Sequence, residues 1–426
     1  GTTAVAAMGS ASALNTLGNI GGVFLAAFLI LPAIGSLWSI KVLSLVSLVL
    51  AALVGLAWCR ARPSASYRKG VVAFAVLIFG AATISTPVQW DYSALSTGSN
   101  VYFRAQPWGR AIDQLESVDG GLTTVTEGTT ADGQVHRTLL TNGKFQGSDS
   151  WGGEMVAQIG IALTPLLHTD QREQALVIGY GSGVTARTLL DVGFQQVDIA
   201  ELSQDIVTMA DRHFSSVNSK ASRHPNAKLY VTDGRNLLLL NPQKYDLISI
   251  EISSIWFAGA ASLYNVEFYD LVNKRLKEAG VLQQWIQLHH ISQEDLLTVI
   301  GSVRARFPYV WFYVVGGQGV IVASQANVPP EKKNAFLIDG AAGMKQLLSV
   351  YGGSITGLGK DLLIGPKEID ALLNSVPGVP MSYWISKDST AKLEYSTPRG
   401  NVLDDPNVVP NNIKFLTSKG KAQLGW

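Results

Sequence analysis

Apolar residues are concentrated in the first ninety positions of this chain. Residues 11–34 and 42–58 contain no charged side chain, and a third uncharged run covers residues 70–88. Each of the first two runs is long enough to cross a bilayer as a helix, because a helix rises 1.5 Å per residue. A secretory signal peptide is the alternative, but three successive runs and the lack of a basic flank argue against it. The pattern predicts transmembrane helices over residues 1–88.

The linker between the second and third runs is basic. Its charged residues are Arg60, Arg62, Arg68 and Lys69. The positive-inside rule places such a loop in the cytoplasm, so everything after residue 90 lies outside if the third run also spans. We therefore expect a multi-pass protein of the cell (inner) membrane, with lipid as a partner.

From Trp90 onward the pattern is that of a globular α/β protein. Two alternating Thr/Val-rich runs, 120–128 and 134–143, predict a β-hairpin around the turn TTADG. Apolar strands then alternate with helices, which is typical of a largely parallel sheet covered on both faces. The expected strands are residues 174–180, 196–202, 228–232, 246–251, 280–286, 309–315 and 319–324. The expected helices are residues 184–192, 204–213, 264–278, 292–306 and, less regularly, 341–350 and 367–375.

These patterns divide the chain into four parts. They are the helices of residues 1–88, a β-hairpin domain over 89–165, the α/β sheet domain over 166–325 and a C-terminal extension over 326–426. A net charge of +1 without a basic stripe argues against a nucleic-acid partner. The single cysteine, Cys59, excludes an intrachain disulfide and a cysteine-based metal site. Because residue 1 is Gly, the natural N-terminus is expected upstream.

The first strand of the sheet domain runs into a glycine-rich loop, GYGSG. Gly179, Gly181 and Gly183, with Ser182 between them, allow a sharp turn and a close approach of a ligand to the backbone. A dinucleotide fingerprint needs its third glycine at position 184, which is Val184. The compact spacing is instead typical of loops that hold S-adenosylmethionine-type nucleosides. A tight turn without a ligand is the alternative.

Acids end three consecutive strands of this domain. Glu201 stands about twenty residues beyond the loop, where an acid typically accepts hydrogen bonds from both ribose hydroxyls. Asp233, followed by Gly234, can accept from an adenine amino group, or it can cap the next helix. Glu251 ends the fourth strand. Parallel strands bring such acids to one edge of the sheet, so together with the glycine loop they predict a nucleoside site.

Several segments resemble a known family when they are taken together. ALVIGYGSGVTARTLL, VDIAEL, VTDGRNLL, YDLISIE and AGAASLYNVEFYDLV occur in this order and resemble the spermidine synthases, or polyamine aminopropyltransferases. NTLGNIGG, QWDYSAL, LLTNGKFQGSD and LEYSTPR extend the resemblance to a branch in which transmembrane helices precede a spermidine-synthase-like domain. The resemblance implies a small N-terminal β-domain followed by a methyltransferase-like Rossmann sheet that binds a nucleoside.

The resemblance also implies a reaction. An amine would attack the carbon next to the sulfonium of S-adenosylmethionine or its decarboxylated form. The attacking amine must be neutral, so a carboxylate has to take its proton, and Glu251 occupies the family's catalytic-acid position. Trp256 and Tyr264 are candidate walls of the substrate site, with a core role as the alternative.

Two departures from the family concern the acceptor. The family's Asp-Ser-Ser-Asp-Pro reads Glu-Ile-Ser-Ser-Ile over residues 251–255, so the second acid is missing. The family's Tyr-His-Glu is represented by Gly152, Gly153 and Glu154, which leaves Glu154 as the candidate partner of the amine. A polycation needs several acids, so we predict a small amine or other nucleophile rather than putrescine.

His289 and His290 follow the fifth strand. Adjacent residues of a strand point to opposite faces, and no third ligand is evident, so a solvated or core role is expected and no metal site. The sequence leaves open whether the protein forms a homodimer.

Three functions remain open from the residues. The first is a membrane-anchored transferase with an S-adenosyl donor. The second is the same scaffold doing methyl transfer or donor-free proton abstraction by Glu251. The third is a non-catalytic nucleoside- or amine-binding module coupled to the helices. Adenosyl donors are cytoplasmic, whereas the basic loop places the domain outside, so the side of the membrane is unresolved.

Overall fold

The computed structural model describes residues 2–61, 66–85, 87–118, 121–130, 133–252, 254–257, 259–401 and 405–422. By its internal contacts the chain falls into two compact units. The helical unit comprises Gly1–Leu95 and Gln114–Leu122, and the sheet unit comprises Ser96–Asp113 and Thr123–Trp426. The four-part division expected from the sequence stays a prediction.

The helical unit consists mainly of apolar helices. They are α1 (Thr2–Leu25), a short π-helical segment η1 (Ala26–Ile30), α2 (Leu31–Ala61) and α3 (Ser66–Ile84), of which α2 and α3 lie side by side. Among the described residues, Val5–Trp58 is the one helical stretch whose length and composition suit a membrane span, and the apolar part of α3, Ala73–Ala82, is shorter. The multi-pass arrangement therefore stays a prediction. Of the basic loop, Arg62 lies outside the described residues.

Helix α2 is broken near its start. Gly35 has φ 73° and ψ 172°, which is not helical, and positive φ favours glycine. The backbone N–H of Ser36, the first residue after the break, donates to the carboxylate of Glu116 (2.7 Å). Trp90 Nε1 donates to the Ser36 hydroxyl (2.8 Å), and the Tyr92 hydroxyl donates to Glu116 (3.1 Å). Side chains from elsewhere in the helical unit thus cap the renewed helix.

The smaller of two sheets is antiparallel. Its order is β1-β2-β3-β4, with β1 (Arg110–Ser117), β2 (Gly121–Thr129), β3 (Val135–Thr141) and β4 (Lys144–Ser148). β2 and β3 pair from Thr123 opposite Thr141 to Thr129 opposite Val135, so the expected hairpin is present.

The larger sheet has eight strands in the order β12-β10-β11-β9-β8-β5-β6-β7. They are β5 (Gln174–Ile178), β6 (Gln196–Glu201), β7 (Ala227–Val231), β8 (Tyr245–Ile250), β9 (Leu276–Ile286), β10 (Tyr309–Val315), β11 (Gln318–Ser324) and β12 (Leu362–Ile364). β5 pairs in parallel with β6 on one side and with β8 on the other, so the strand order reverses at β5. Ligands of such sheets bind beyond the carboxyl ends of the strands at this reversal.

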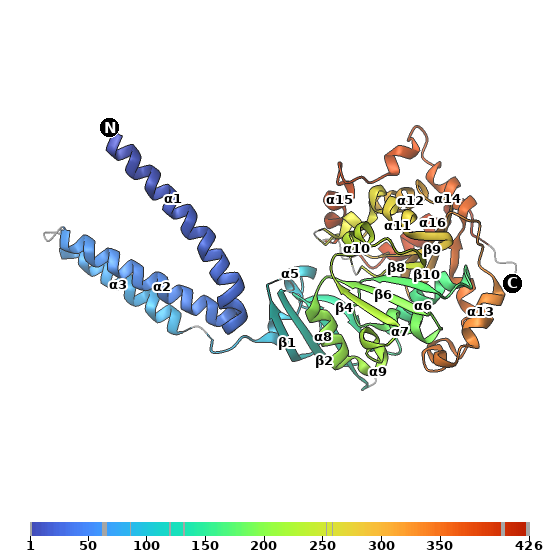
Figure 1. The fold of residues 1–426 in the computed structure, drawn as a ribbon, viewed down its shortest axis with the longest axis horizontal. Helices are drawn as coiled ribbons and strands as arrows, with labels where there is room; N and C mark the ends of the chain where they lie inside the picture. Colours follow the sequence, from blue (N-terminus) through green and yellow to red (C-terminus); the bar gives the residue numbers. More distant parts are fainter. Residues whose placement is uncertain are drawn as a thin grey trace. The chain divides into compact units, whose positions relative to one another are not determined.

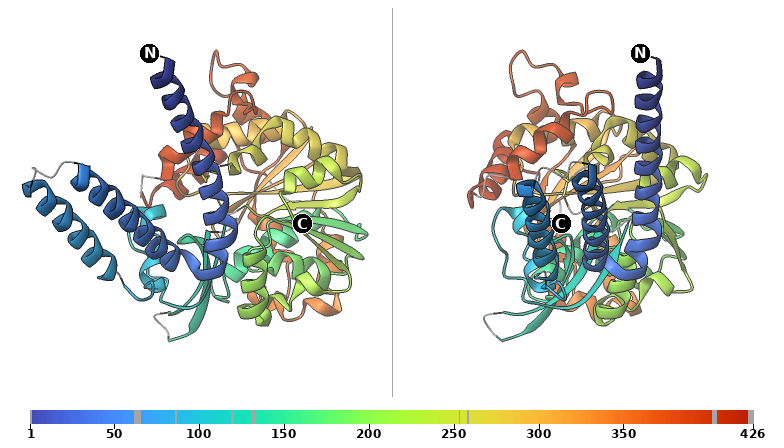
Figure 2. Two further views of the ribbon diagram at one scale, coloured as in Figure 1. Left: turned by 60° about the vertical axis from the view of Figure 1, so that its left-hand side comes forward. Right: turned by 90° about the vertical axis from the view of Figure 1, so that its left-hand side faces the viewer.

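Helices cover both faces of the larger sheet (Figure 1, Figure 2). α6 (Glu154–Leu163) and α7 (Val184–Asp191) lie on one face; α10 (Gly234–Leu240), α11 (Val266–Arg275) and α12 (Gln293–Arg304) lie on the other. The predicted α/β class with a Rossmann sheet is therefore confirmed. The helix expected at 341–350 is instead two 3-10 turns, η5 (Ala342–Met344) and η6 (Leu347–Tyr351).

The remaining α-helices are short. They are α4 (Tyr92–Leu95), α5 (Ser99–Tyr102), α8 (Gln204–His213), α9 (Ser215–Asn218), α13 (Lys332–Asp339), α14 (Pro366–Leu373), α15 (Lys392–Asn401) and α16 (Val408–Leu416). α8 has the bounds predicted from the sequence, and α14 lies within two residues of the helix expected at 367–375.

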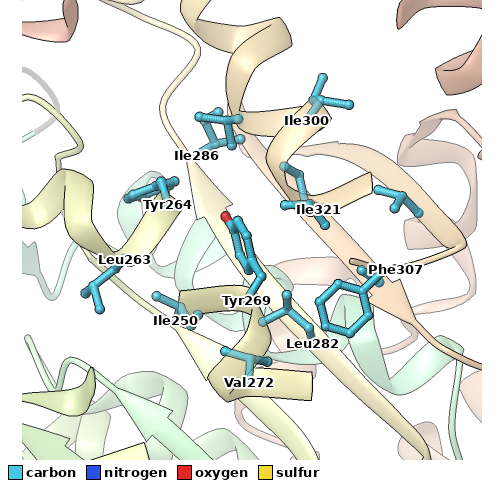
Figure 3. Packing of buried hydrophobic residues seen from close by; sticks show 14 of the residues in the cluster. Ile250, Leu263, Tyr264, Tyr269, Val272, Leu282, Ile286, Ile300, Phe307 and Ile321 are labelled. Carbon is cyan, nitrogen blue, oxygen red and sulfur yellow. The ribbon is translucent and has the colours of Figure 1, made fainter. Parts of the chain in front are cut away.

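A buried hydrophobic cluster lies between the larger sheet and α10–α12, and Figure 3 shows part of it. Ile250, at the end of β8, is fully buried there beside Tyr264 and Tyr269. Burying each such side chain contributes about 1.5–3 kcal/mol. This core holds the carboxyl end of β8, and therefore the residue that follows it, in place.

Candidate active site

One cavity of about 360 Å³ lies in the sheet unit, at the carboxyl ends of β5 and β8. Its lining comes from segments far apart in the sequence. They are Tyr102, Arg104, Gln106, Trp108, Phe145, Gln146, Glu154, Gln158, Ile161, Tyr180, Gly181, Ser182, Val184, Thr185, Glu251, Ile252, Ser254, Trp256, Trp285, His289, His290 and Gln318. A cavity of this size is typical of small-molecule sites.

Two carboxylates face this cavity. The backbone N–H of Glu251 donates to the carbonyl of Ile178 (2.8 Å), which holds Glu251 at the sheet edge. Burial raises the pKa of Glu251 to about 7, and the negative charge of Glu154 adds to the rise. The Ser249 hydroxyl lies 2.9 Å from the carboxyl oxygen, and a hydrogen bond between them in the ionised state opposes the rise. Burial also raises the pKa of Glu154, against a hydrogen bond from Gln158 (3.1 Å). A cation between the two acids would stabilise the charged form of both.

The glycine loop packs directly against the residue after β8. Gly179, Gly181 and Gly183 all have positive φ (97°, 51° and 83°). A Cβ on Gly179 would lie 2.9 Å from the carbonyl oxygen of Glu251. Gly181 and Ser182 line the cavity, and the Ser182 hydroxyl donates to Gln158 Oε1 (2.5 Å). The loop therefore presents its backbone to the cavity beside the two carboxylates.

Glu201 lies behind the loop rather than in the cavity lining. Its carboxylate accepts the backbone N–H groups of Tyr180 (2.8 Å) and Ser203 (2.9 Å). Burial raises its pKa, and these hydrogen bonds oppose the rise. Glu201 therefore holds the loop in shape, and its contact with a ribose stays a prediction.

Asp233 also lies outside the cavity lining. It is the N-cap of α10 and accepts the backbone N–H of Asn236 (2.9 Å), so the capping alternative applies. Gly234 lets the start of α10 lie close against Ile178, where a Cβ would collide. A contact of Asp233 or Gly234 with an adenine stays a prediction.

The two aromatic candidates lie in different places. Trp256 lines the cavity and stands edge-on to Phe257, with Lys144 Nζ 5.8 Å from its ring centroid. Tyr264 is fully buried in the core, where its hydroxyl donates to the carbonyl of Trp285 (3.0 Å) (Figure 3). The structure thus gives Tyr264 the core placement that the sequence left as its alternative. Ser253, in the same loop, lies outside the described residues.

The histidine pair follows β9, as expected from the sequence, but the geometry on which its expected role was based does not apply. β9 ends at Ile286, so the alternation of a strand does not apply to His289 and His290. Both line the cavity, with their rings edge-on and 5.3 Å apart. Burial lowers the pKa of His289 to about 4, so its imidazole is neutral.

Several lining residues had no sequence signal. Trp108, Gln158, Trp285 and Gln318 belong to no motif, and only the fold brings them together. Gln146 lies in the segment LLTNGKFQGSD but was not singled out as a site residue. Trp108 Nε1, His290 Nδ1 and Gln318 Oε1 are buried without a hydrogen-bond partner in the part of the chain that the structure describes. Unpaired polar atoms in a cavity wall are groups that a ligand can satisfy.

Comparison with known proteins matches the same region. A family model for the spermine/spermidine synthase domain matches residues 154–327. The polyamine aminopropyltransferase of Thermoplasma acidophilum is 31% identical over 188 residues, covering 42% of this chain and 67% of that protein. That of Nitrosomonas europaea is 29% identical over 264 residues, covering 60% and 74%. Polyamine aminopropyltransferase 2 of Pseudomonas aeruginosa is 26% identical, covering 42% of this chain and about half (51%) of its own length.

Solved structures give more distant similarities. A spermidine synthase from Thermotoga maritima has a TM-score of 0.45 at 19% identity, covering 53% of this chain and 75% of its own. Human methyltransferase-like protein 13 in complex with SAH has a TM-score of 0.34 at 16% identity, covering 46% and 90%. The sequence matches carry the assignment, and they confirm the resemblance on which it was predicted. This chain belongs to the spermidine synthase-like family of transferases.

Proposed function

We propose that this chain is a membrane-anchored transferase that moves an aminopropyl or related group from an S-adenosyl sulfonium donor to an amine. The observation that carries the proposal is that Glu251 and Glu154 face one cavity beside the glycine loop. The donor supplies a carbon activated by the adjacent positive sulfur. The amine nitrogen bonds to that carbon, the carbon–sulfur bond breaks with its electron pair going to sulfur, and Glu251 takes the amine proton.

The residues present fit such a donor. Paired carboxylates and the faces of Trp256 and Trp285 suit a sulfonium cation. Gly181 and Ser182 offer backbone groups to a nucleoside, with Gly179 and Gly183 shaping the loop. We propose that Glu201 and Asp233, with Gly234, complete the nucleoside site. S-adenosylmethionine and its decarboxylated form are both candidates.

Calorimetry tests the donor directly. The purified protein is titrated with S-adenosylmethionine, its decarboxylated form and methylthioadenosine. Micromolar binding of at least one supports the proposal, and the ratio of the first two affinities identifies the donor. Millimolar or no binding of all three compounds would overturn the proposal that the donor is an S-adenosyl compound.

The acceptor is proposed to be a small amine other than a polyamine. Two acids line the described part of the cavity, and the other ionisable groups there include a neutral His289 and the cationic Arg104. A polycation would find few further anions, and each missing ion pair costs roughly tenfold in affinity. Competition assays with putrescine and monoamines test this, and efficient conversion of putrescine to spermidine would refute it.

A second candidate is donor-free proton abstraction by Glu251 on the same scaffold. It is favoured by the position of Glu201, which bonds the loop backbone and does not line the cavity. The test uses a substrate that carries deuterium on an acidic carbon. Exchange of that deuterium with solvent in the absence of any adenosyl compound would support this alternative.

The helical unit is proposed to anchor the protein by several crossings. The run Val5–Trp58 would be about 80 Å long as one helix, more than twice a hydrocarbon core of roughly 30 Å. Gly35 divides it, and Trp38, Trp90 and Tyr92 line a small pocket at the break, as interfacial aromatic residues do. The basic loop lies at the other end of α2. A C-terminal reporter that is active on one side of the membrane decides the orientation.

A further inference from the structure

Glu251 is in contact with a small buried hydrogen-bond network that the proposed reaction does not use. Ser249 on β8 and Gln283 on β9 are both fully buried. Ser249 Oγ lies 2.9 Å from Glu251 Oε1 and 2.6 Å from Gln283 Oε1. Both neighbours are acceptor oxygens when Glu251 is ionised, and a serine hydroxyl carries one proton. Ser249 therefore cannot donate to both at once.

The orientation of the Gln283 amide follows from its other contact. The backbone N–H of Ile250 donates to Gln283 Oε1 (3.2 Å). Turning the amide around would set its NH₂ group against this N–H, donor against donor. The oxygen of Gln283 therefore faces Ser249, and its Nε2 has no partner among the described residues.

One arrangement of protons satisfies all three groups. We infer that Ser249 and Gln283 form a relay that holds a proton on Glu251 until a cation enters the cavity. In this state the Ser249 hydroxyl donates to Gln283 Oε1 and accepts from the protonated carboxyl group of Glu251. When Glu251 ionises, the Ser249 hydroxyl rotates and donates to the carboxylate. Gln283 Oε1 then accepts only from the N–H of Ile250. The inference rests on the proposed function, in which Glu251 is the base.

The surroundings of Glu251 determine when it ionises. Among the described residues, the ionisable groups near Glu251 include Glu154 from α6, Tyr180 from the glycine loop, Tyr264 from the 3-10 turn η4 (Ala260–Tyr264), and His289 and His290 after β9. The charge of Glu154 helps to retain the proton, and His289 is neutral. A sulfonium or ammonium ion favours the carboxylate, so its entry releases the proton to solvent. Glu251 is then an acid before binding and a base afterwards.

Infrared difference spectroscopy tests the relay without turnover. The carboxylic C=O stretch is followed against pH, and subtraction of Glu251→Gln spectra isolates the signal of Glu251. Gln283→Met frees the Ser249 hydroxyl to donate to the carboxylate, so the titration midpoint of Glu251 should fall by about one pH unit. If Ser249 already donates to Glu251 in the parent, the midpoint stays unchanged and the relay is overturned.

Two further variants complete the design. In a Ser249→Ala background, Gln283→Met should no longer move the midpoint, because the hydroxyl is gone. Gln284→Met removes the neighbouring buried glutamine, which bonds Tyr269 and not Ser249, and should leave the midpoint unchanged. If Gln283→Met fails to fold, Gln283→Leu tests the same step: a midpoint below that of the parent supports the relay, and an unchanged midpoint overturns it.

The outcome separates this inference from the proposed function. If Gln283→Met lowers the titration midpoint of Glu251 but the protein has no transferase activity, the relay is supported and the proposed function is refuted. If the protein is an active transferase but Gln283→Met leaves the midpoint unchanged, the proposed function is supported and the relay is refuted.

Discussion

Glu201, the last residue of β6, and Glu251, the residue directly after β8, illustrate how acids at equivalent strand ends can serve different purposes. Both strands are parallel to β5 and lie on either side of it in the larger sheet, so both acids stand at the same edge. Glu201 accepts backbone N–H groups of the glycine loop and does not line the cavity. Glu251 shares a hydrogen bond with the Ser249 hydroxyl and lines a cavity together with a second carboxylate, that of Glu154. The strand end determines where an acid lies, whereas its hydrogen-bond partners determine what it can do.

Removing the base should have the largest effect. Glu251→Gln keeps the size of the side chain but cannot take a proton. Turnover should fall by roughly 10²-fold or more while ligand affinity changes little. Steady-state kinetics and calorimetry measure the two effects. The exposed Glu278→Gln is the matched control; a Glu251 variant as active as its control would remove Glu251 from the mechanism.

The same change at the other acid should have a different result. In Glu201→Gln, one of the two N–H groups from Tyr180 and Ser203 would face an NH₂ group and lose its acceptor. An unsatisfied buried N–H costs about 1–3 kcal/mol, so the melting temperature should fall together with activity. Thermal unfolding and ligand titration measure both. A variant with the parent's melting temperature but weaker nucleoside binding would instead place Glu201 in contact with the ligand.

The raised pKa of Glu251 should also make the stability of the protein depend on pH. Burial raises the pKa of Glu251 from its ordinary 4.5 to about 7. Between these values the folded protein retains a proton that the unfolded chain has lost, so this group's contribution to stability is present below pH 4.5 and is lost as pH rises through 7. Melting temperature should decline over this interval in the parent and decline less in Glu251→Gln. Equal slopes in the two proteins would contradict the raised pKa.

The comparison also explains what the sequence could predict. Periodicity placed seven of the eight strands of the larger sheet, all except the short β12, and it placed α8, because apolar runs and strand-ending acids are local signals. The polar wall of the cavity was not predictable in this way. Trp108, Gln158 and Gln318 come from a loop, a helix and a strand without motifs, and only tertiary packing brings them to one site. Tyr264 was a plausible wall residue, but its turn directs it into the core behind the cavity.

A third acid extends the comparison to the helical unit, with the smallest expected effect. Glu116 accepts the backbone N–H of Ser36 at the Gly35 break, so its role resembles that of a helix cap. Glu116→Ala should lower stability by about 1 kcal/mol, as loss of a cap does. Glu116→Gln keeps an acceptor and loses only the charge near the helix N-terminus, worth roughly 0.3–1 kcal/mol. Thermal unfolding in detergent, monitored by tryptophan fluorescence, should give the highest melting temperature for the parent, a lower one for Glu116→Gln and the lowest for Glu116→Ala. Three equal curves would mean that the break in α2 persists without its cap.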